Sequence, residues 1–299
     1  MAQIPITVVR YPEKQARDIF AAFIFGSRYT PPRPPRGIPP ALVARFLETE
    51  LKPETAPLAY QRALEAMRFY ETTGLGPHFR KILAAAAAGQ AYRDARRAAF
   101  VLQMLGDLGT PEDSEWGADY LDRQLLPRPD FPDIADLLLE TLLALAPAGG
   151  LAAFAARLRT DSGKLREIAD NRLPGAADLI AAKKRLLASP ASAPRRQELI
   201  AIYLGQSDLS EPYLVTWAAR MLRREAMEGG PAAICAGFGQ AIDALASKEN
   251  GDSQTGFEIV RAAQAILYLQ GKLTPQWSKL YARSHPERAQ NFLSDDMPM

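Results

Sequence analysis

The chain has 299 residues, 47% of them hydrophobic and 23% charged, a mixture that excludes a wholly disordered chain. Its 36 Lys and Arg residues against 34 Asp and Glu residues give a net charge of only +2. This balance argues against a dedicated nucleic-acid-binding protein, since such proteins carry a strong positive excess. Cys235 is the only cysteine, so an intramolecular disulfide and a cysteine-based zinc site are excluded.

The distribution of apolar residues predicts the fold class. Alanine, leucine and arginine are abundant, and long β-branched runs are confined to the first ten residues, so we predict an all-α fold. No stretch reaches the roughly 18 apolar residues of a membrane span, and the N-terminus lacks the pattern of a secretory signal. We therefore expect no membrane insertion and a cytoplasmic location.

Residues 1–40 differ in pattern from the rest of the chain. Residues 4–9 are predicted to form a short extended apolar segment, and apolar side chains at three- and four-residue spacing predict a helix over residues 13–25. The prolines of residues 30–40 fix φ and restrict the residues before them. We therefore expect extended polyproline II in this connector.

Part of the proline-rich connector matches a binding pattern. Pro31, Pro34 and Arg36 have the spacing that aromatic-lined grooves recognise in polyproline II ligands, so they are candidate partner-binding residues. The alternative interpretation is a stiff connector that packs on the body of the protein.

From residue 40 onward the apolar spacing predicts one helix after another. We expect N-terminal helical repeats over 41–190, C-terminal helical repeats over 191–294 and a polar tail over 295–299, with the boundary in the SPASAP segment. The helices are predicted at 40–50, 55–73, 77–88, 134–146, 151–159, 162–172, 175–189, 195–205, 210–228, 232–247, 256–270 and 274–281, with a last one ending near Leu293.

The segment 94–126 is predicted to form a helix, a tight turn and a second helix. Gly106 and Gly109 are expected to end the first helix, because glycine adopts left-handed backbone angles without a Cβ clash. The Thr110 hydroxyl is expected to cap the second helix, whose first residue is Pro111. One apolar stripe covers the first helix, formed by Ala95, Ala98, Ala99, Leu102 and Leu105.

The same segment is repeated near the end of the chain. Arg97-Ala98-Ala99 recurs as Arg261-Ala262-Ala263, and Thr110-Pro111 recurs as Thr274-Pro275, both 164 residues later. Four steps of about 41 residues would account for this offset, and HEAT-type arrays have repeats of about 40–47 residues.

The segment 94–126 resembles a HEAT repeat, which carries an arginine and small residues early in its first helix and Leu-Gly before the turn. The matching residues are Arg96, Arg97, Ala98, Ala99, Leu105 and Gly106. This resemblance implies a right-handed α-solenoid of HEAT-like helical hairpins with a short extended N-terminal segment. The alternative is an irregular helical bundle whose alanine and leucine content produces the matches.

Residues that could carry catalysis are sparse. The two histidines, His78 and His285, lie far apart, and no glycine-rich phosphate loop or nucleophile elbow occurs. Glu112, Asp113 and Glu115 fall in the first turn of a predicted helix, where the helix dipole favours acids. We predict a protein that is not an enzyme and has no cofactor or metal.

The remaining surface candidates are clusters of basic residues. Arg93 and Arg97 are one helical turn apart, and Arg220, Arg223 and Arg224 have helical spacing as well. With Pro31, Pro34 and Arg36, these arginines are the predicted partner-binding residues. We predict a scaffold or adaptor that binds another protein, as a subunit of a larger complex. The alternatives are a HEAT-like nucleic-acid-binding or DNA-repair protein and an enzyme whose carboxylates converge only in the fold.

Overall fold

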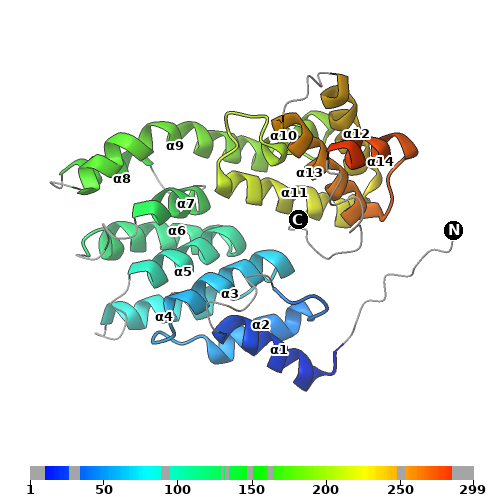
Figure 1. The fold of residues 1–299 in the computed structure, drawn as a ribbon. Helices are drawn as coiled ribbons and strands as arrows, with labels where there is room; N and C mark the ends of the chain where they lie inside the picture. Colours follow the sequence, from blue (N-terminus) through cyan, green and yellow to red (C-terminus); the bar gives the residue numbers. More distant parts are fainter. Residues whose placement is uncertain are drawn as a thin grey trace. The chain divides into compact units, whose positions relative to one another are not determined.

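The computed structural model describes residues 11–26, 34–88, 95–128, 131, 135–146, 151–160, 164–247 and 253–284. Every regular element within these ranges is helical (Figure 1), which confirms the predicted all-α class for this part of the chain. The chain divides into two compact units, residues 1–181 and 182–299. The division falls inside one helix, and the boundary predicted between residues 190 and 191 stays a prediction.

The first unit begins with a series of short helices. The elements are α1 (Glu13–Phe25), α2 (Pro40–Glu50), α3 (Pro57–Tyr70), α4 (Gly76–Ala88), α5 (Ala95–Leu108), α6 (Pro111–Tyr120), the π-helical turn η1 (Leu121–Leu125), α7 (Ala135–Leu145), α8 (Leu151–Thr160) and the first part of α9 (Lys164–Ala188). Three of them, α2, α3 and α6, start at a proline, which suits the first helical position because the N–H that it lacks would have no partner within the helix.

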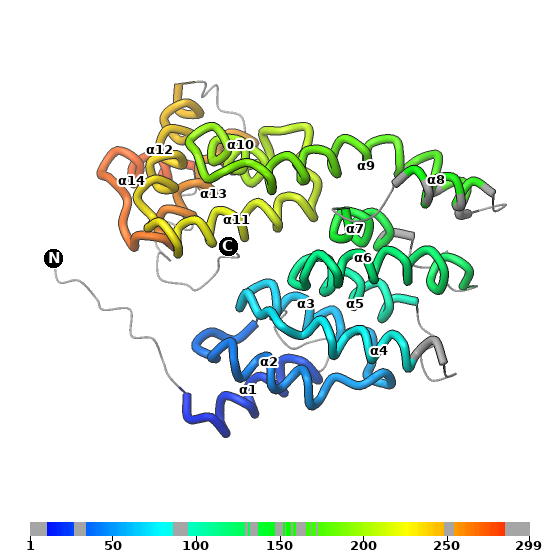
Figure 2. Tube along the Cα trace, turned by 180° about the vertical axis from the view of Figure 1, so that it is seen from behind, coloured from blue at the N-terminus to red at the C-terminus, as the bar shows by residue number. Residues whose placement is uncertain are grey.

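Alternate helices of the first unit pack on one another. Helix α1 contacts α3, α3 contacts α5 and α5 contacts α7, while α2, α4 and α6 pack beside them (Figure 2). One continuous apolar core runs from Ala16 on α1 to Ala176 on α9. Leu102 on α5 is fully buried in this core, so the stripe predicted on α5 faces neighbouring helices.

A glycine sets the distance between α5 and α7. A Cβ atom on Gly106 would lie 2.5 Å from the carbonyl carbon of Ala144, closer than real Cβ contacts allow. The prediction that Gly106 helps to end α5 is wrong, because the helix continues to Leu108. Glycine is needed at this position because only a residue without a Cβ atom allows α7 to approach α5 so closely.

The turn between α5 and α6 has the predicted cap. The Thr110 hydroxyl accepts a hydrogen bond from the Asp113 N–H at 3.3 Å, and Asp113 Oδ2 accepts one from the Thr110 N–H at 2.9 Å. Asp113 is only 3% exposed and forms an ion pair with Arg80 on α4 at 2.5 Å. Asp113, which takes part in the cap of α6, therefore also connects α6 to α4.

A chain of polar contacts crosses the α3–α5–α7 row. Arg68 on α3 donates to Asp107 on α5 at 2.8 Å and to Gln103 at 3.4 Å. Gln103, fully buried, donates in turn to Thr141 on α7 at 3.4 Å. Because buried polar groups cost free energy unless they are hydrogen-bonded, these bonds favour one alignment of the three helices.

Glu140 lies beside this polar chain on α7 and gives a pH-dependent prediction. Burial raises the pKa of its carboxyl, Arg68 partly opposes that rise, and Asp107 adds to it. A pKa raised in the folded state means that the ionised carboxylate destabilises the fold at neutral pH. We expect Glu140→Gln to increase the free energy of unfolding at pH 7. The gain should vanish below about pH 4, where the acid is protonated in both states.

Urea unfolding curves of the wild type and of Glu140→Gln, measured from pH 3 to pH 8, check this prediction. A variant that is less stable than the wild type at pH 7 would contradict it, since that result would mean that the ionised carboxylate contributes a favourable contact.

Two predicted features of the backbone are wrong. The helices expected at 162–172 and 175–189 form the single helix α9 with Pro174 inside it, because the buried stripe of Ala169, Leu173 and Ala176 continues across the proline. The connector is not one extended segment, because it turns at residues 36–37. Gly37 has φ +78°, which glycine adopts without strain.

Within the described residues, the second unit contains the rest of α9 and five further helices. Helix α10 packs on α11, α12 packs on α13, and α13 packs on α14. Outside α9, the helices begin and end within three residues of their predicted positions. The bounds are α10 (Ala193–Leu204), α11 (Pro212–Gly229), α12 (Ala232–Ser247), α13 (Ser253–Gln270) and α14 (Pro275–Ser284).

Some predictions fall outside the described residues. These are the extended segment at 4–9, the last helix near Leu293, the tail at 295–299, and the candidate residues Pro31 and Arg93.

Candidate functional site

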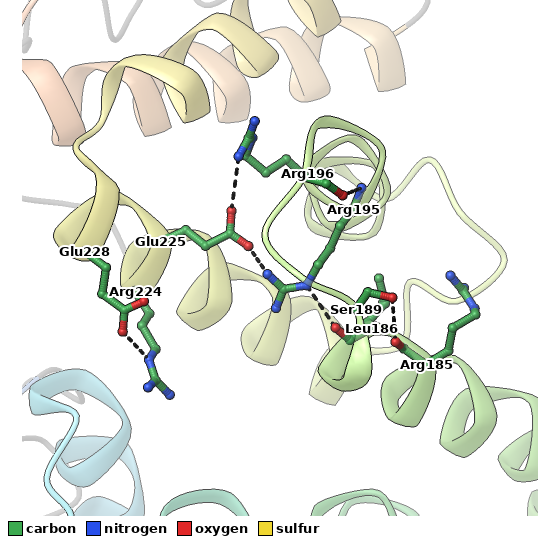
Figure 3. Close-up of polar contacts among 9 residues, drawn as sticks. Arg185, Leu186, Ser189, Arg195, Arg196, Arg224, Glu225 and Glu228 are labelled. Carbon is green, nitrogen blue, oxygen red and sulfur yellow. Dashed lines mark hydrogen bonds and ion pairs between the residues drawn. The ribbon is translucent and has the colours of Figure 1, made fainter.

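The second unit carries a cluster of ion pairs at the junction of α9, α10 and α11 (Figure 3). We call it the arginine cluster, and it consists of Arg185, Arg195, Arg196, Arg224, Glu198, Glu225 and Glu228. The first turn of α10 orients two of its arginines, because the Ser192 hydroxyl caps this helix by accepting from the Arg195 N–H at 3.5 Å.

The inner part of the arginine cluster holds the three helices together. Arg195 Nε donates to the Leu186 carbonyl at the end of α9 at 2.9 Å, and its guanidinium forms an ion pair with Glu225 on α11. Arg196 Nη1 lies 3.8 Å from the other oxygen of Glu225. Arg195 and Glu225 are largely shielded from solvent, so we assign this part of the cluster to contacts between helices and not to partner binding.

The outer part of the arginine cluster is open to solvent. Arg185 pairs with Glu198 and keeps the pKa of that carboxyl below its ordinary value through their hydrogen bonds. Arg224 Nε donates to Glu228 at 2.8 Å on α11, and both side chains are exposed. Exposed pairs of this kind contribute about 0–1 kcal/mol each, so a partner's charged groups can replace them at small cost.

The three predicted arginines of α11 have three different environments. Arg220 is only 7% exposed, Arg223 is half-buried and Arg224 is exposed. Arg220 lies three residues after the buried Trp217, on the stripe that packs into the unit. The three side chains therefore do not form one exposed basic stripe, and only Arg223 and Arg224 reach the surface.

The candidate residues of the first unit lie apart along its sequence. Arg97 is half-buried on α5, close enough to Tyr60 on α3 to influence the pKa of that phenol. Pro34 is half-buried and Arg36 is exposed at the turn of the connector. Ile38, two residues later, is part of the apolar core, as expected for a connector that packs on the body.

A buried lysine was missed at the sequence level. Lys183 is only 3% exposed, and its Nζ donates to the Tyr213 hydroxyl at 2.8 Å. The same Nζ lies 5.0 Å from the centre of the Tyr213 ring and 6.0 Å from that of Trp217. Its spacing from the buried Leu179 and Leu186 was the available signal, because residues four and three apart share a helix face.

Cys235 and His78 have the environments of structural residues. Cys235 is buried on α12, and burial raises the pKa of its thiol, as expected for a small core residue. Burial lowers the pKa of His78 on α4. Within the ranges that the structure covers, no three His, Cys, Asp or Glu side chains lie close enough to hold a metal ion. No helix in those ranges combines the length and the apolar character needed to cross a membrane.

A groove of about 190 Å³ lies between α1 and α2 in the first unit. Leu42 and Phe46 supply its apolar surface. Two exposed ion pairs join its sides: Arg45 donates to Glu13 at 2.7 Å, and Arg17 donates to Glu50 at 2.5 Å. The residues that line it are Glu13, Arg17, Leu42, Arg45, Phe46 and Thr49.

Comparison with known proteins gives no further guide to the site. A scan against protein-family models, a search of curated proteins and a search of solved structures each found no match for the chain.

Proposed function

We propose that the chain is a non-enzymatic helical-repeat scaffold or adaptor that binds another protein, as a subunit of a larger complex. The packing of alternate helices, α1 on α3, α3 on α5 and α5 on α7, is the observation that carries this proposal. In repeat proteins each helical pair buries its apolar face against the next pair, and the outer faces remain available for binding.

We further propose that both units consist of HEAT-like hairpins arranged as a right-handed α-solenoid. The two copies of the repeated motif support this proposal, because they have matching environments. Thr274 Oγ1 accepts from the Trp277 N–H at 3.3 Å, as Thr110 does from Asp113. The paired alanines after the motif arginine are buried in both copies, at Ala98 and Ala99 and at Ala262 and Ala263.

The arginines of the two motif copies are also comparable. Arg261 on α13 lies 4.4 Å from the centre of the Tyr203 ring on α10. The charge of Arg97 on α5 partly opposes the rise that burial causes in the pKa of Tyr60 on α3. In each copy the motif arginine therefore lies within electrostatic range of a buried tyrosine on a neighbouring helix, as expected for repeats that stack in the same way.

The outer part of the arginine cluster is the binding surface that we assign to the partner. Its exposed cations lie on α9 and α11, and the largely shielded Arg195 contacts both helices through the Leu186 carbonyl and Glu225, so a partner would meet an ordered surface. Purification of the tagged chain from its native cells, followed by quantitative mass spectrometry, tests the proposal. We expect one protein to co-purify at close to equimolar amounts.

The double variant Arg185→Glu/Arg224→Glu provides the matched comparison, since it reverses two exposed charges and leaves Arg195 intact. We expect it to recover at least tenfold less of the partner. A wild-type chain that enriches no protein over an untagged control would contradict the proposed function.

Nucleic-acid binding by the basic residues is the alternative function, and the charge distribution gives a prediction about it. Carboxylates face Arg185, Arg195, Arg196 and Arg224. Repulsion from these acids weakens any contact with phosphate, so we expect no measurable binding to a 20-base-pair duplex at about 100 mM salt.

Fluorescence anisotropy with labelled duplex and single-stranded DNA measures this prediction. The variant Arg223→Glu/Arg224→Glu is the suitable comparison, because Arg220 is buried and its charge reversal would disrupt the fold. Micromolar binding with a steep salt dependence, lost in that variant, would favour the alternative function.

A further inference from the structure

The end of α1 presents an exposed aromatic side chain next to the α1–α2 groove. Phe25 is 48% exposed, although large aromatic side chains are usually buried. Its ring centre lies 6.0 Å from that of Phe46, which lines the groove. An apolar projection and an apolar recess therefore lie side by side on the same surface.

The projecting end of α1 is held firmly. Arg62 on α3 is buried, and its Nη1 donates to the carbonyl of Phe23 at 2.9 Å and to that of Gly26 at 2.8 Å. These bonds satisfy carbonyls at the C-terminal end of α1, on either side of Phe25. The position of the Phe25 backbone is thus fixed before any partner arrives, which lowers the entropic cost of binding through it.

The charges around the groove are self-complementary. Two cations, Arg17 and Arg45, alternate with two anions, Glu13 and Glu50, so the surface has no single sign that would select an acidic or a basic partner. A second copy of the same surface, related by a two-fold axis, offers an anion to each cation and a cation to each anion. The net charge of +2 adds little repulsion between two copies.

We propose that the α1–α2 face binds a second copy of this chain, with Phe25 of each copy entering the α1–α2 groove of the other. Phe25 and the groove are neighbours on each copy. A two-fold axis that passes between them therefore brings Phe25 of each copy to the groove of the other at the same time. Ion pairs within each copy, such as Glu13 with Arg45, are exchanged for the same pairs between copies. The proposal does not depend on a partner at the arginine cluster.

The contact is small, so the dimer is expected to be weak. Helices α1 and α2 have 13 and 11 residues, and a face of this size corresponds to the low end of specific interfaces, under about 1,200 Å² in total. We expect a weak dimer that dissociates on dilution, as for transient interfaces of this size.

Sedimentation velocity of the purified chain from about 1 to 300 μM tests the proposal. The average mass should rise from 32.8 kDa toward twice that value. Phe25→Ala should raise the dissociation constant at least tenfold, and circular dichroism should show an unchanged fold, since Phe25 is half exposed. Met227→Asp alters a side chain on α11 that is 71% exposed and is the control that should dimerise like the wild type.

A charge swap distinguishes the loss of an ion pair between the two copies from a general destabilisation of the fold. Arg45→Glu alone should weaken the dimer, and Glu13→Arg/Arg45→Glu should restore it, because the pair is rebuilt with reversed signs. A mass of 32.8 kDa at every concentration overturns the proposal, as does self-association that Phe25→Ala leaves unchanged. Either result leaves the proposed binding of another protein untouched, because that binding is measured by co-purification through different residues.

Discussion

Asp113→Ala is expected to lower the free energy of unfolding by about 2–4 kcal/mol. The carboxylate accepts from the Thr110 N–H within the α6 capping box, and loss of such a cap costs about 0.5–2 kcal/mol. It also pairs with Arg80 on α4 at 2.5 Å, and a hydrogen bond to a charged group contributes about 1.5–3 kcal/mol. One substitution thus removes one of the two hydrogen bonds of the capping box and a contact between two helices.

Chemical denaturation of Asp113→Ala, Asp113→Asn and Glu115→Ala measures these contributions separately. Asparagine keeps an acceptor for the Thr110 N–H and loses the charge opposite Arg80, so it should fall between alanine and the wild type. Glu115 is exposed on the same helix, and its replacement should change the free energy of unfolding by less than about 0.5 kcal/mol. A loss below about 1 kcal/mol for Asp113→Ala would contradict the role of Asp113 as a connection between α4 and α6.

Gly106→Ala is expected to lower the free energy of unfolding by about 1–3 kcal/mol, although alanine is the better helix former. The added Cβ atom would lie 2.5 Å from the backbone carbonyl carbon and oxygen of Ala144, and backbone atoms cannot rotate away as a side-chain end can. Helices α5 and α7 would have to move apart, and this movement would loosen the apolar contacts around the buried Leu102.

Gly175→Ala is the matched control, because Gly175 is also inside a helix and has no atom within 4 Å of the position of its missing Cβ. Without a clash, the helix propensity of alanine should raise the free energy of unfolding by about 1 kcal/mol. Opposite signs for the two substitutions, measured by urea unfolding, are the expected result. If both substitutions stabilised the protein, the close contact between α5 and α7 would be absent.

The helix positions could be predicted because the sequence marks their ends. Pro40, Pro57, Pro111 and Pro275 each start a helix close to the predicted position, since proline is suited to the first turn. The interior of α9 was predicted wrongly, because the predicted helices at 162–172 and 175–189 leave a gap where Pro174 lies within one continuous helix. The burial of the flanking apolar stripe, which keeps the helix continuous, depends on neighbours that local spacing does not reveal.

The candidate site could be predicted less well, because burial overrides the preference of charged side chains for the surface. Arg220 was predicted to be a partner-binding residue on the surface, yet it is buried in the second unit, as is Lys183. Their spacing from buried apolar residues put each of them on the apolar stripe of its helix. Which groups surround such a side chain depends on how separate helices pack, and local spacing does not reveal that packing. The Arg195–Glu225 pair joins residues 30 positions apart, and nothing in the local sequence indicates that register.

Amide hydrogen exchange of the chain, alone and in complex with the protein that co-purifies with it, tests the proposed scaffold role most directly. A scaffold that binds through an ordered helical surface should gain protection on adjacent helices, over the end of α9, the start of α10 and the second half of α11. Protection confined to one loop, or exchange that does not change when the co-purified protein is added, would contradict the account.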